Sequence, residues 1–178
     1  MTAGRKVAGA RPVGRTPTRP VRDRADKDIH DFTWDMVAIN NSLEDIRRAW
    51  AEALGVSGPQ WLILMAISES DDDQGISVGE VSEKLQVNPT FVTAQSKSLE
   101  SAGLLNRSPS PTDARIVLMS LTDRARKEIE KLSVRRKILN DSVFADMSER
   151  TLKETKEAIA SVRRRVEEAA LQLRLVRR

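Results

Sequence analysis

The chain has 178 residues and a formal net charge of +4, with no cysteine and one histidine. Without cysteine there can be no disulfide, no thiolate nucleophile and no cysteine-based redox sensor. One histidine cannot build a His-rich zinc or iron site. A metal site made of carboxylates alone stays open as an alternative, but we expect no metal and no cofactor. Charged residues make up 31% of the chain and aromatic residues 3%, which favours a mostly helical protein over a β-sandwich or barrel.

The sequence also shows no pattern typical of a membrane-spanning or secreted protein. No apolar run is long enough to cross a bilayer, and the first residues contain no apolar stretch typical of a secretory signal. We therefore expect a cytoplasmic protein. Residues 1–24 hold seven Lys or Arg and one Asp, a net charge of +6, so the remaining residues carry −2. The positive charge belongs to a tail and does not by itself indicate that the folded part binds nucleic acid.

Residues 1–26 are rich in Arg, Gly, Pro and Thr and have almost no large apolar side chains. Such a segment cannot bury enough surface to offset its chain entropy, so we predict a disordered basic tail. Two interpretations stay open. The tail is either simply solvated or a basic arm that contacts the backbone or minor groove of DNA.

The range 27–56 is predicted to be one long helix. Its apolar residues recur at alternating steps of four and three, namely Phe32, Met36, Ile39, Leu43, Ile46 and Trp50. This spacing puts them in one stripe on a helix. Gly55 is placed to end the helix.

Three helix starts follow in the range 57–126. Ser57 to Gln60 and Ser77 to Glu80 fit capping boxes, and Asn88 with Pro89 opens a third helix that reaches about Ala102. Beyond Gly103 the side-chain pattern changes to the alternation typical of strands, at 104–107 and 115–121. A turn-rich segment at 108–113 joins these two strands into a β-hairpin. The order helix, short helix, helix and β-hairpin is that of a winged helix-turn-helix domain.

Two helices are predicted for the range 127–178. The first continues from Thr122 to about Leu139, and the second begins near Ser148. The second carries a heptad seam made of Leu152, Thr155, Ile159, Val162, Val166, Ala169, Leu173 and Val176. A seam of this length needs a partner, either within the chain or from a second copy.

In a winged helix-turn-helix domain the third helix fits the DNA major groove, which is about 12 Å wide, and the hairpin reaches the minor groove. Polar residues of the third helix and of the hairpin are the candidate DNA contacts: Thr90, Thr93, Gln95, Lys97, Arg107, Asp113 and Arg115. The opposite face of the helix would be buried through Val92, Leu99 and Ala102. Further cations that either contact phosphates or are only solvated are Lys84, Arg124 and Arg126.

The region from Ser57 to Arg126 resembles the DNA-binding core of the MarR (multiple antibiotic resistance regulator) family. The resemblance is carried by Leu85-Gln86-Val87-Asn88, Val92-Thr93, Leu99-Glu100, Gly103-Leu104-Leu105, Arg107, Asp113-Ala114-Arg115 and the run from Val117 to Thr122. The most specific element is Asp-x-Arg in the wing, followed by an apolar strand and Leu-Thr. The long flanking helices also match the layout of the family, so the resemblance extends over about 30–173.

The resemblance implies a mainly α fold with a small β-hairpin wing, in which the N- and C-terminal helices form a homodimer. Arg115 would enter the minor groove while Asp113 holds its guanidinium. Two-fold symmetry would place the two third helices about 34 Å apart, on an inverted-repeat operator of double-stranded DNA. Family members commonly repress, and many release DNA when a small aromatic molecule binds.

The sequence thus predicts a ligand-responsive repressor whose effector is an aromatic acid or its coenzyme A thioester. Candidate ligand residues are His30, Trp34, Trp50 and Trp61, although the tryptophans also suit core or dimer packing. One departure concerns Ala94, because the family often has Arg there, so base recognition must differ at that position.

Two other classes of protein are alternatives to a ligand-responsive repressor. The first is an architectural, nucleoid-type DNA-binding protein that uses the basic tail and wings with little sequence preference. The second is an enzyme. The sequence disfavours this class, because it contains no Gly-rich phosphate loop, no Gly-x-Ser-x-Gly and no His-Glu-x-x-His. We therefore expect no catalytic residues.

Overall fold

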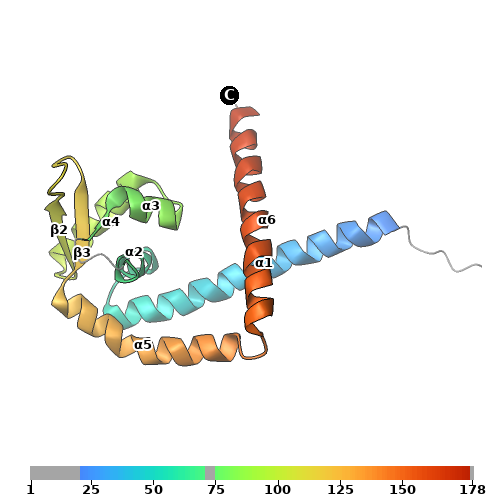
Figure 1. Cartoon of the computed structure of the whole chain (residues 1–178), viewed down its shortest axis with the longest axis horizontal. Coiled ribbons are helices and arrows are strands. Elements are labelled where there is room, and N and C mark those ends of the chain that lie inside the picture. Colours follow the sequence, from blue (N-terminus) through green and yellow to red (C-terminus); the bar gives the residue numbers. More distant parts are fainter. Residues whose placement is uncertain (1–20, 71–74, 177–178) are drawn as a thin grey trace, which may run out of the picture. The chain divides into compact units, whose positions relative to one another are not determined.

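The computed structural model describes the backbone of residues 21–70 and 75–176, and the side chains of 26–70 and 75–175. Within these ranges the chain forms six helices and three short strands (Figure 1). The helices are α1 Val21–Leu54, α2 Gly58–Ser68, α3 Val78–Leu85, α4 Pro89–Ser101, α5 Asp123–Val143 and α6 Glu149–Val176. The strands are β1 Ile76–Ser77, β2 Leu105–Pro109 and β3 Val117–Leu121. The predicted mainly α fold with a small β wing is confirmed.

The chain divides into two compact units, and the boundary along the sequence falls in α2, between Trp61 and Leu62. The first unit contains α1, which begins at Val21 and so starts earlier than the predicted end of the disordered tail at residue 26. The physical reason lies in the sequence, which has neither Pro nor Gly between Pro20 and Gly55. Residues 1–20 of the predicted tail lie outside the described residues. Gly55, at φ +69°, ends the helix as expected.

The strands of the second unit form one antiparallel sheet in the order β1-β3-β2. Leu105 of β2 pairs with Leu121 of β3, and Pro109 pairs with Val117. The sequence predicted only this hairpin, so β1 is a correction: Ile76 pairs with Met119 and closes the second edge of β3. A strand of two residues is too short to show the alternation on which sequence patterns depend.

The core of the second unit gathers apolar side chains from α2, α3, α4 and the sheet. The most deeply buried are Ile63, Leu64, Val81, Val92, Leu99, Leu105 and Met119. Burial of such side chains supplies most of the stabilisation of a small domain. One expectation needs correction, because Ala102 is exposed; Ser96, for which the sequence made no prediction, is buried.

Helix α5 joins this core only at its start. The Thr122 side chain accepts a hydrogen bond from Ala125 N, and the first turns bury Ala125 and Ile129. Further along, Val134 and Ile138 are exposed. None of the described helices is long and apolar enough to cross a membrane.

Candidate nucleic-acid interface

Helix α4 has a defined start and end. The Asn88 side chain accepts a hydrogen bond from Thr90 N at 2.8 Å, and Pro89 occupies the first helical position. An Asn cap followed by Pro satisfies a free amide and presets the backbone for a helix. Gly103, at φ +70°, then turns the chain into the sheet. The cap fixes where the first turn of α4 lies relative to the sheet.

Helix α4 has one buried and one exposed face. Val92, Ser96 and Leu99 are buried, at helical spacing, and Ser96 Oγ donates a hydrogen bond to Thr93 O at 3.1 Å. The residues of α4 that are exposed are Pro89, Thr90, Phe91, Ala94, Lys97, Ser98, Glu100 and Ser101. Of the predicted DNA contacts, Thr90 and Lys97 lie on this open face, while Thr93 and Gln95 are half-buried beside it.

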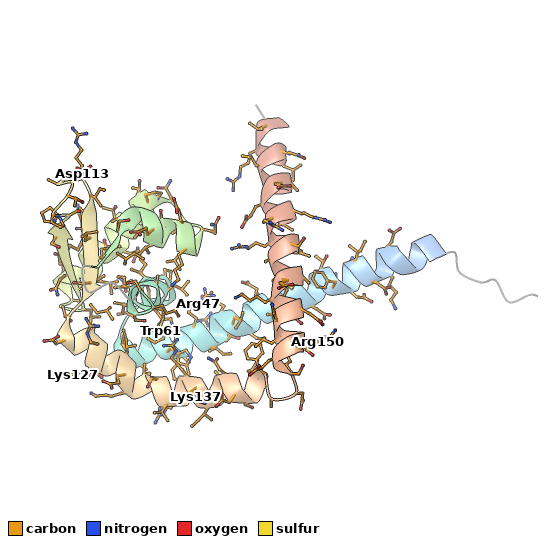
Figure 2. All side chains as sticks on the ribbon, viewed as in Figure 1. Arg47, Trp61, Asp113, Lys127, Lys137 and Arg150 are labelled. Carbon is orange, nitrogen blue, oxygen red and sulfur yellow. The ribbon has the colours of Figure 1, made fainter. Side chains whose placement is uncertain are left out.

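Asp113 lies at the tip of the wing (Figure 2). Arg115 follows it in the loop between β2 and β3, and both side chains are exposed. Asp113 Oδ1 accepts a hydrogen bond from Arg115 N at 2.9 Å. Ser110 N also donates to Ile116 O at 2.8 Å and so closes the turn. The carboxylate therefore holds the backbone of Arg115, whereas the family resemblance implied a bond to the guanidinium. No described residue forms an ion pair with the Arg115 guanidinium.

Arg107 lies at the base of the wing, away from the tip. Its side chain is only 13% exposed, and Nη1 lies 3.7 Å from Glu100 Oε2 of α4. Its Nε is buried without a hydrogen-bond partner among the described residues. Arg107 was expected to contact DNA, but its burial favours a role in joining β2 to α4.

A hollow of about 450 Å³ lies between α3, α4 and the wing. It is lined by Ser77, Val78, Gly79, Thr93, Arg107, Arg115, Ile116 and Val117. Three of the predicted DNA contacts, namely Thr93, Arg107 and Arg115, therefore surround one depression. Ser77 caps α3 at its rim and takes part in a capping box with Glu80.

The Ser77 side chain, followed by the Ser77 backbone amide, lowers the pKa of Glu80 below its ordinary value. Hydrogen bonds to the charged form of a carboxyl have this effect. The carboxylate also sits in the first turn of α3, where the helix dipole favours negative charge. The predicted capping box is confirmed, because Ser77 N donates to Glu80 Oε2 and Glu80 N donates to Ser77 Oγ.

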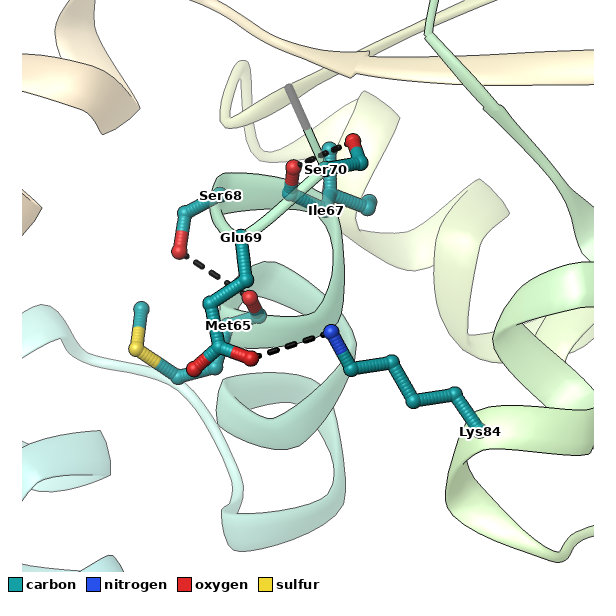
Figure 3. Close-up of polar contacts among 6 residues, drawn as sticks. All are labelled: Met65, Ile67, Ser68, Glu69, Ser70 and Lys84. Carbon is teal, nitrogen blue, oxygen red and sulfur yellow. Dashed lines mark hydrogen bonds and ion pairs between the residues drawn. The ribbon is translucent and has the colours of Figure 1, made fainter. Parts of the chain in front are cut away.

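Two other cations of the second unit, Lys84 and Arg124, are engaged within the protein. Lys84 Nζ lies 3.0 Å from Glu69 Oε2, which ties α3 to the end of α2 (Figure 3). Beside this pair, Ser68 Oγ and Ser70 Oγ donate to the carbonyls of Met65 and Ile67. Arg124 Nη1 donates to Ala102 O at 3.3 Å, behind the end of α4. Lys84 and Arg124 therefore have structural partners.

The four candidate ligand residues all belong to the first unit. Trp34 Nε1 donates a hydrogen bond to His30 Nε2 at 3.0 Å, and the two exposed rings meet edge to face. Trp50 is half-buried and Trp61 is buried. Trp34 and Trp50 lie on the same helix at about 1.5 Å of rise per residue, which separates them by roughly 24 Å. One chain therefore does not bring all four residues together.

A metal site would need several ligand side chains close together. Within the described ranges, no three His, Asp or Glu side chains gather closely enough to hold an ion. The second unit instead offers an exposed helix face beside a basic wing. Three helices with a three-stranded sheet in the order α2, β1, α3, α4, β2, β3 define a winged helix-turn-helix protein.

Comparison with known proteins identifies the family. The MarR family model matches residues 56–117. The uncharacterized HTH-type transcriptional regulator YdgJ of Bacillus subtilis is 30% identical over 94 residues, covering 53% of this chain and 56% of the relative. The transcriptional regulator AdcR of Streptococcus pneumoniae is 30% identical over 106 residues, covering 59% of this chain and 70% of AdcR. The chain belongs to the MarR family of transcriptional regulators.

Solved structures support the same fold. A MarR/EmrR family regulator from Acinetobacter sp. ADP1 has a TM-score of 0.65 at 20% identity, covering 79% of this chain and 97% of that one. The MepR–DNA complex of S. aureus has a TM-score of 0.66 at 16% identity, with coverage of 76% and 96%. CouR of Rhodococcus jostii RHA1, bound to p-coumaroyl-CoA, has a TM-score of 0.65 at 16% identity, with coverage of 74% and 91%. At these identities the likeness shows the fold.

One residue of the open face of α4, Phe91, was missed from the sequence, while Ala94 was noted only as a departure from the family pattern. Phe91 was not singled out because a single aromatic next to Val92 looks like part of the core. Projecting α4 on a helical wheel would have put Ala94 opposite Val92 and Leu99, and Phe91 about 100° from Val92, outside the buried stripe.

Proposed function

We propose that this protein is a ligand-responsive repressor that binds an inverted-repeat operator as a homodimer. An aromatic acid, or its coenzyme A thioester, binds and releases it from DNA. The observation that carries the proposal is the exposed face of α4 beside an exposed wing arginine, in a chain of the MarR family.

The DNA contacts come from two places. Thr90 and Lys97 occupy the open face of α4, which has the dimensions to enter a major groove about 12 Å wide. Arg115, whose guanidinium has no partner within the described residues, extends from the wing toward the minor groove. Thr93, Gln95 and Asp113 support this surface. Arg107 is mostly buried and stabilises it through its ion pair with Glu100 of α4. MepR, which has the same fold, was solved as a DNA complex.

The homodimer rests on apolar side chains that the single chain leaves exposed. On α1 these include Ile39 and Leu43, and on α6 they include Val166 at 61% and Leu173 at 68% exposure. The predicted seam of α6 continues to Val176, whose side chain lies outside the described residues. Apolar stripes on long helices are stable when a second helix covers them. A symmetric pair would bury both stripes at once.

The effector class follows from a relative and from the residues of α1. CouR was solved with p-coumaroyl-CoA, the thioester of an aromatic acid. The aromatic and polar groups of His30 and Trp34, together with Trp50 and Trp61 from either copy, suit a ligand with an aromatic ring. A ligand can act only by binding one dimer geometry more tightly than the other. It would change the separation of the two α4 helices.

The proposal is tested by selecting bound sequences from random duplexes and measuring their affinity. The expected result is an inverted repeat that binds more tightly than a random duplex of equal length, with affinity falling steeply as salt rises. Candidate aromatic acids and their coenzyme A thioesters are then titrated into the complex, and one of them should release the DNA. Equal binding of both duplexes would contradict the proposal.

Removal of residues 1–26 separates the two DNA-binding models. A repressor that depends on α4 and the wing keeps most of its preference for the selected duplex without the tail. Loss of nearly all affinity, for selected and random duplexes alike, would instead favour an architectural protein that binds through the tail.

A further inference from the structure

Over its first two turns, the fully open part of α4 carries apolar side chains and a single hydroxyl, that of Thr90, with Thr93 and Gln95 half-buried beside it. Thr90, Phe91 and Ala94 are exposed there, and Phe91 is 38% exposed. Phe91 and Ala94 are three residues apart and Thr90 and Ala94 are four apart, so the three side chains are neighbours on one helix surface. The opposite face is already filled by Val92, Ser96 and Leu99. Thr90 and Ala94 therefore lie outside the core, and Phe91 leaves part of its ring exposed.

Cations are absent from the same two turns. Lys97, in the third turn, is the only Lys or Arg in the sequence of α4. Arg107, the nearest arginine on β2, is held by Glu100 and is mostly buried. The bidentate contact of Arg to guanine O6 and N7, which is the commonest specific contact in the major groove, cannot come from the start of this helix.

We propose that the first two turns of α4 recognise thymine methyl groups, which pack against Phe91, Ala94 and the methyl of Thr90. This inference rests on the proposed function, because it concerns how the same DNA-binding surface selects its operator. In the major groove thymine differs from the other bases by its C5 methyl, and Ala, Thr and Phe are the side chains that contact it. The half-site should therefore contain A·T pairs where the start of α4 enters the groove.

The size of the effect follows from the burial of one methyl group. Removing one buried methyl lowers affinity by about fourfold. Since a two-fold dimer makes each contact twice, removal from both half-sites lowers affinity by roughly fifteenfold when the contacts are independent. Changes of this size are well resolved by fluorescence anisotropy.

The test uses the full-length protein and the best duplex from the selection described above. Each thymine is replaced in turn by deoxyuridine, which lacks the C5 methyl and keeps the O4 acceptor and the base pair. At one or two positions per half-site the replacement should lower affinity by about fourfold, and by roughly fifteenfold in both half-sites. At the other thymines the affinity should change little.

Two variants assign the methyl contacts to α4. Phe91→Ala keeps a good helix former and removes the ring, and Ala94→Ser keeps the size and adds a hydroxyl. Each should bind the selected duplex more weakly and should lose sensitivity to deoxyuridine at its own position, as a double-mutant cycle measures. Ser101→Ala is the control, because Ser101 is exposed in the last turn and its hydroxyl donates to Lys97 O. It should keep full sensitivity. Circular dichroism checks that all three variants are folded.

Failure of the inference differs from failure of the proposed function. Specific binding of the selected duplex with no loss at any deoxyuridine would overturn methyl recognition and leave the repressor model intact. Sensitivity to deoxyuridine that persists in both Phe91→Ala and Ala94→Ser would also overturn it. If no duplex binds better than random DNA, the proposed function fails and methyl recognition fails with it.

Discussion

Arg107 of β2 and Glu100 of α4 form an ion pair in which Nη1 lies 3.7 Å from Oε2. The arginine side chain is mostly buried and the glutamate is 44% exposed, so the pair sits at the edge of the core. It is a direct link between the wing and the helix whose open face is proposed to contact DNA. The geometry of one element therefore depends on the other.

Breaking this pair should affect both stability and DNA binding. Glu100→Gln leaves the guanidinium of Arg107 without its carboxylate, and the free energy of unfolding should fall by about 1 kcal/mol. Affinity for the selected duplex should fall as well, because the wing is no longer held at one angle to α4. Urea denaturation and fluorescence anisotropy measure the two effects. Glu130→Gln, at an exposed glutamate of α5, is the matched control and should change neither.

Arg115→Ala should weaken DNA binding without a change in stability. The guanidinium is exposed and has no ion-pair partner within the described residues, so its removal costs the free protein nothing. Affinity should fall by about tenfold, and the slope of log affinity against log salt should decrease by about one for each copy in the dimer. Arg135→Ala, an exposed arginine of α5, is the control. An unchanged salt slope would show that the wing tip does not contact DNA.

The Ser77–Glu80 capping box should make stability depend on pH in the acid range. Because the pKa of Glu80 is lowered in the folded state, the box stabilises the fold at neutral pH, and this stabilisation is lost as the pH falls through the folded-state pKa. Ser77→Ala should lower the free energy of unfolding by about 1 kcal/mol at neutral pH. The difference from the parent protein should narrow well below pH of about 4.3, the ordinary glutamate pKa.

Urea denaturation of Ser77→Ala and of the parent protein, at neutral pH and well below a pH of about 4.3, measures how the stability difference changes. Ser133→Ala, at an exposed serine within α5, serves as the control and should be neutral or slightly stabilising. A difference between Ser77→Ala and the parent that stays constant with pH would mean that the Glu80 carboxylate takes no part in the cap.

Gly75 precedes β1 and should not tolerate a side chain. It has φ +90°, and an added Cβ would lie 2.8 Å from Met119 O. Gly75→Ala should therefore destabilise the protein by about 2 kcal/mol or more, from backbone strain and the contact with β3. Gly55→Ala tests strain alone, since Gly55 has φ +69° with open space around it, and should cost about 1 kcal/mol. Equal effects of the two substitutions in thermal or urea unfolding would refute the role of the Met119 contact.

Local signals in the sequence were enough to predict most of the fold. Capping residues marked the starts of α3 and α4, because Ser77 and Asn88 act through hydrogen bonds to residues two or three positions away. Helical spacing correctly predicted that Val92 and Leu99 of α4 are buried, whereas Ala102 is exposed and the burial of Ser96 was not predicted. Strand β1 escaped prediction, because it forms only through pairing with a partner more than forty residues away in the chain.

The candidate DNA-binding site was predicted less completely, because contacts between residues far apart in the sequence decide which Lys and Arg side chains are free to contact DNA. Arg107 and Lys84 looked like free cations in the sequence, and only the fold brings them to Glu100 and Glu69. The role of Asp113 also differs, since its carboxylate binds the backbone of Arg115. The positions of Thr90, Lys97 and Arg115 on open surface agree with their proposed contacts, which the DNA experiments test directly.

The central claim is that two copies of the chain hold their α4 helices at a fixed separation on one face of B-form DNA. The direct measurement compares the selected inverted repeat with a version that carries five extra base pairs, about half a helical turn, between its half-sites. The account predicts that this insertion lowers affinity to that of a single half-site, while an insertion of about ten base pairs restores part of it. Affinity that is the same for all three duplexes would contradict the account.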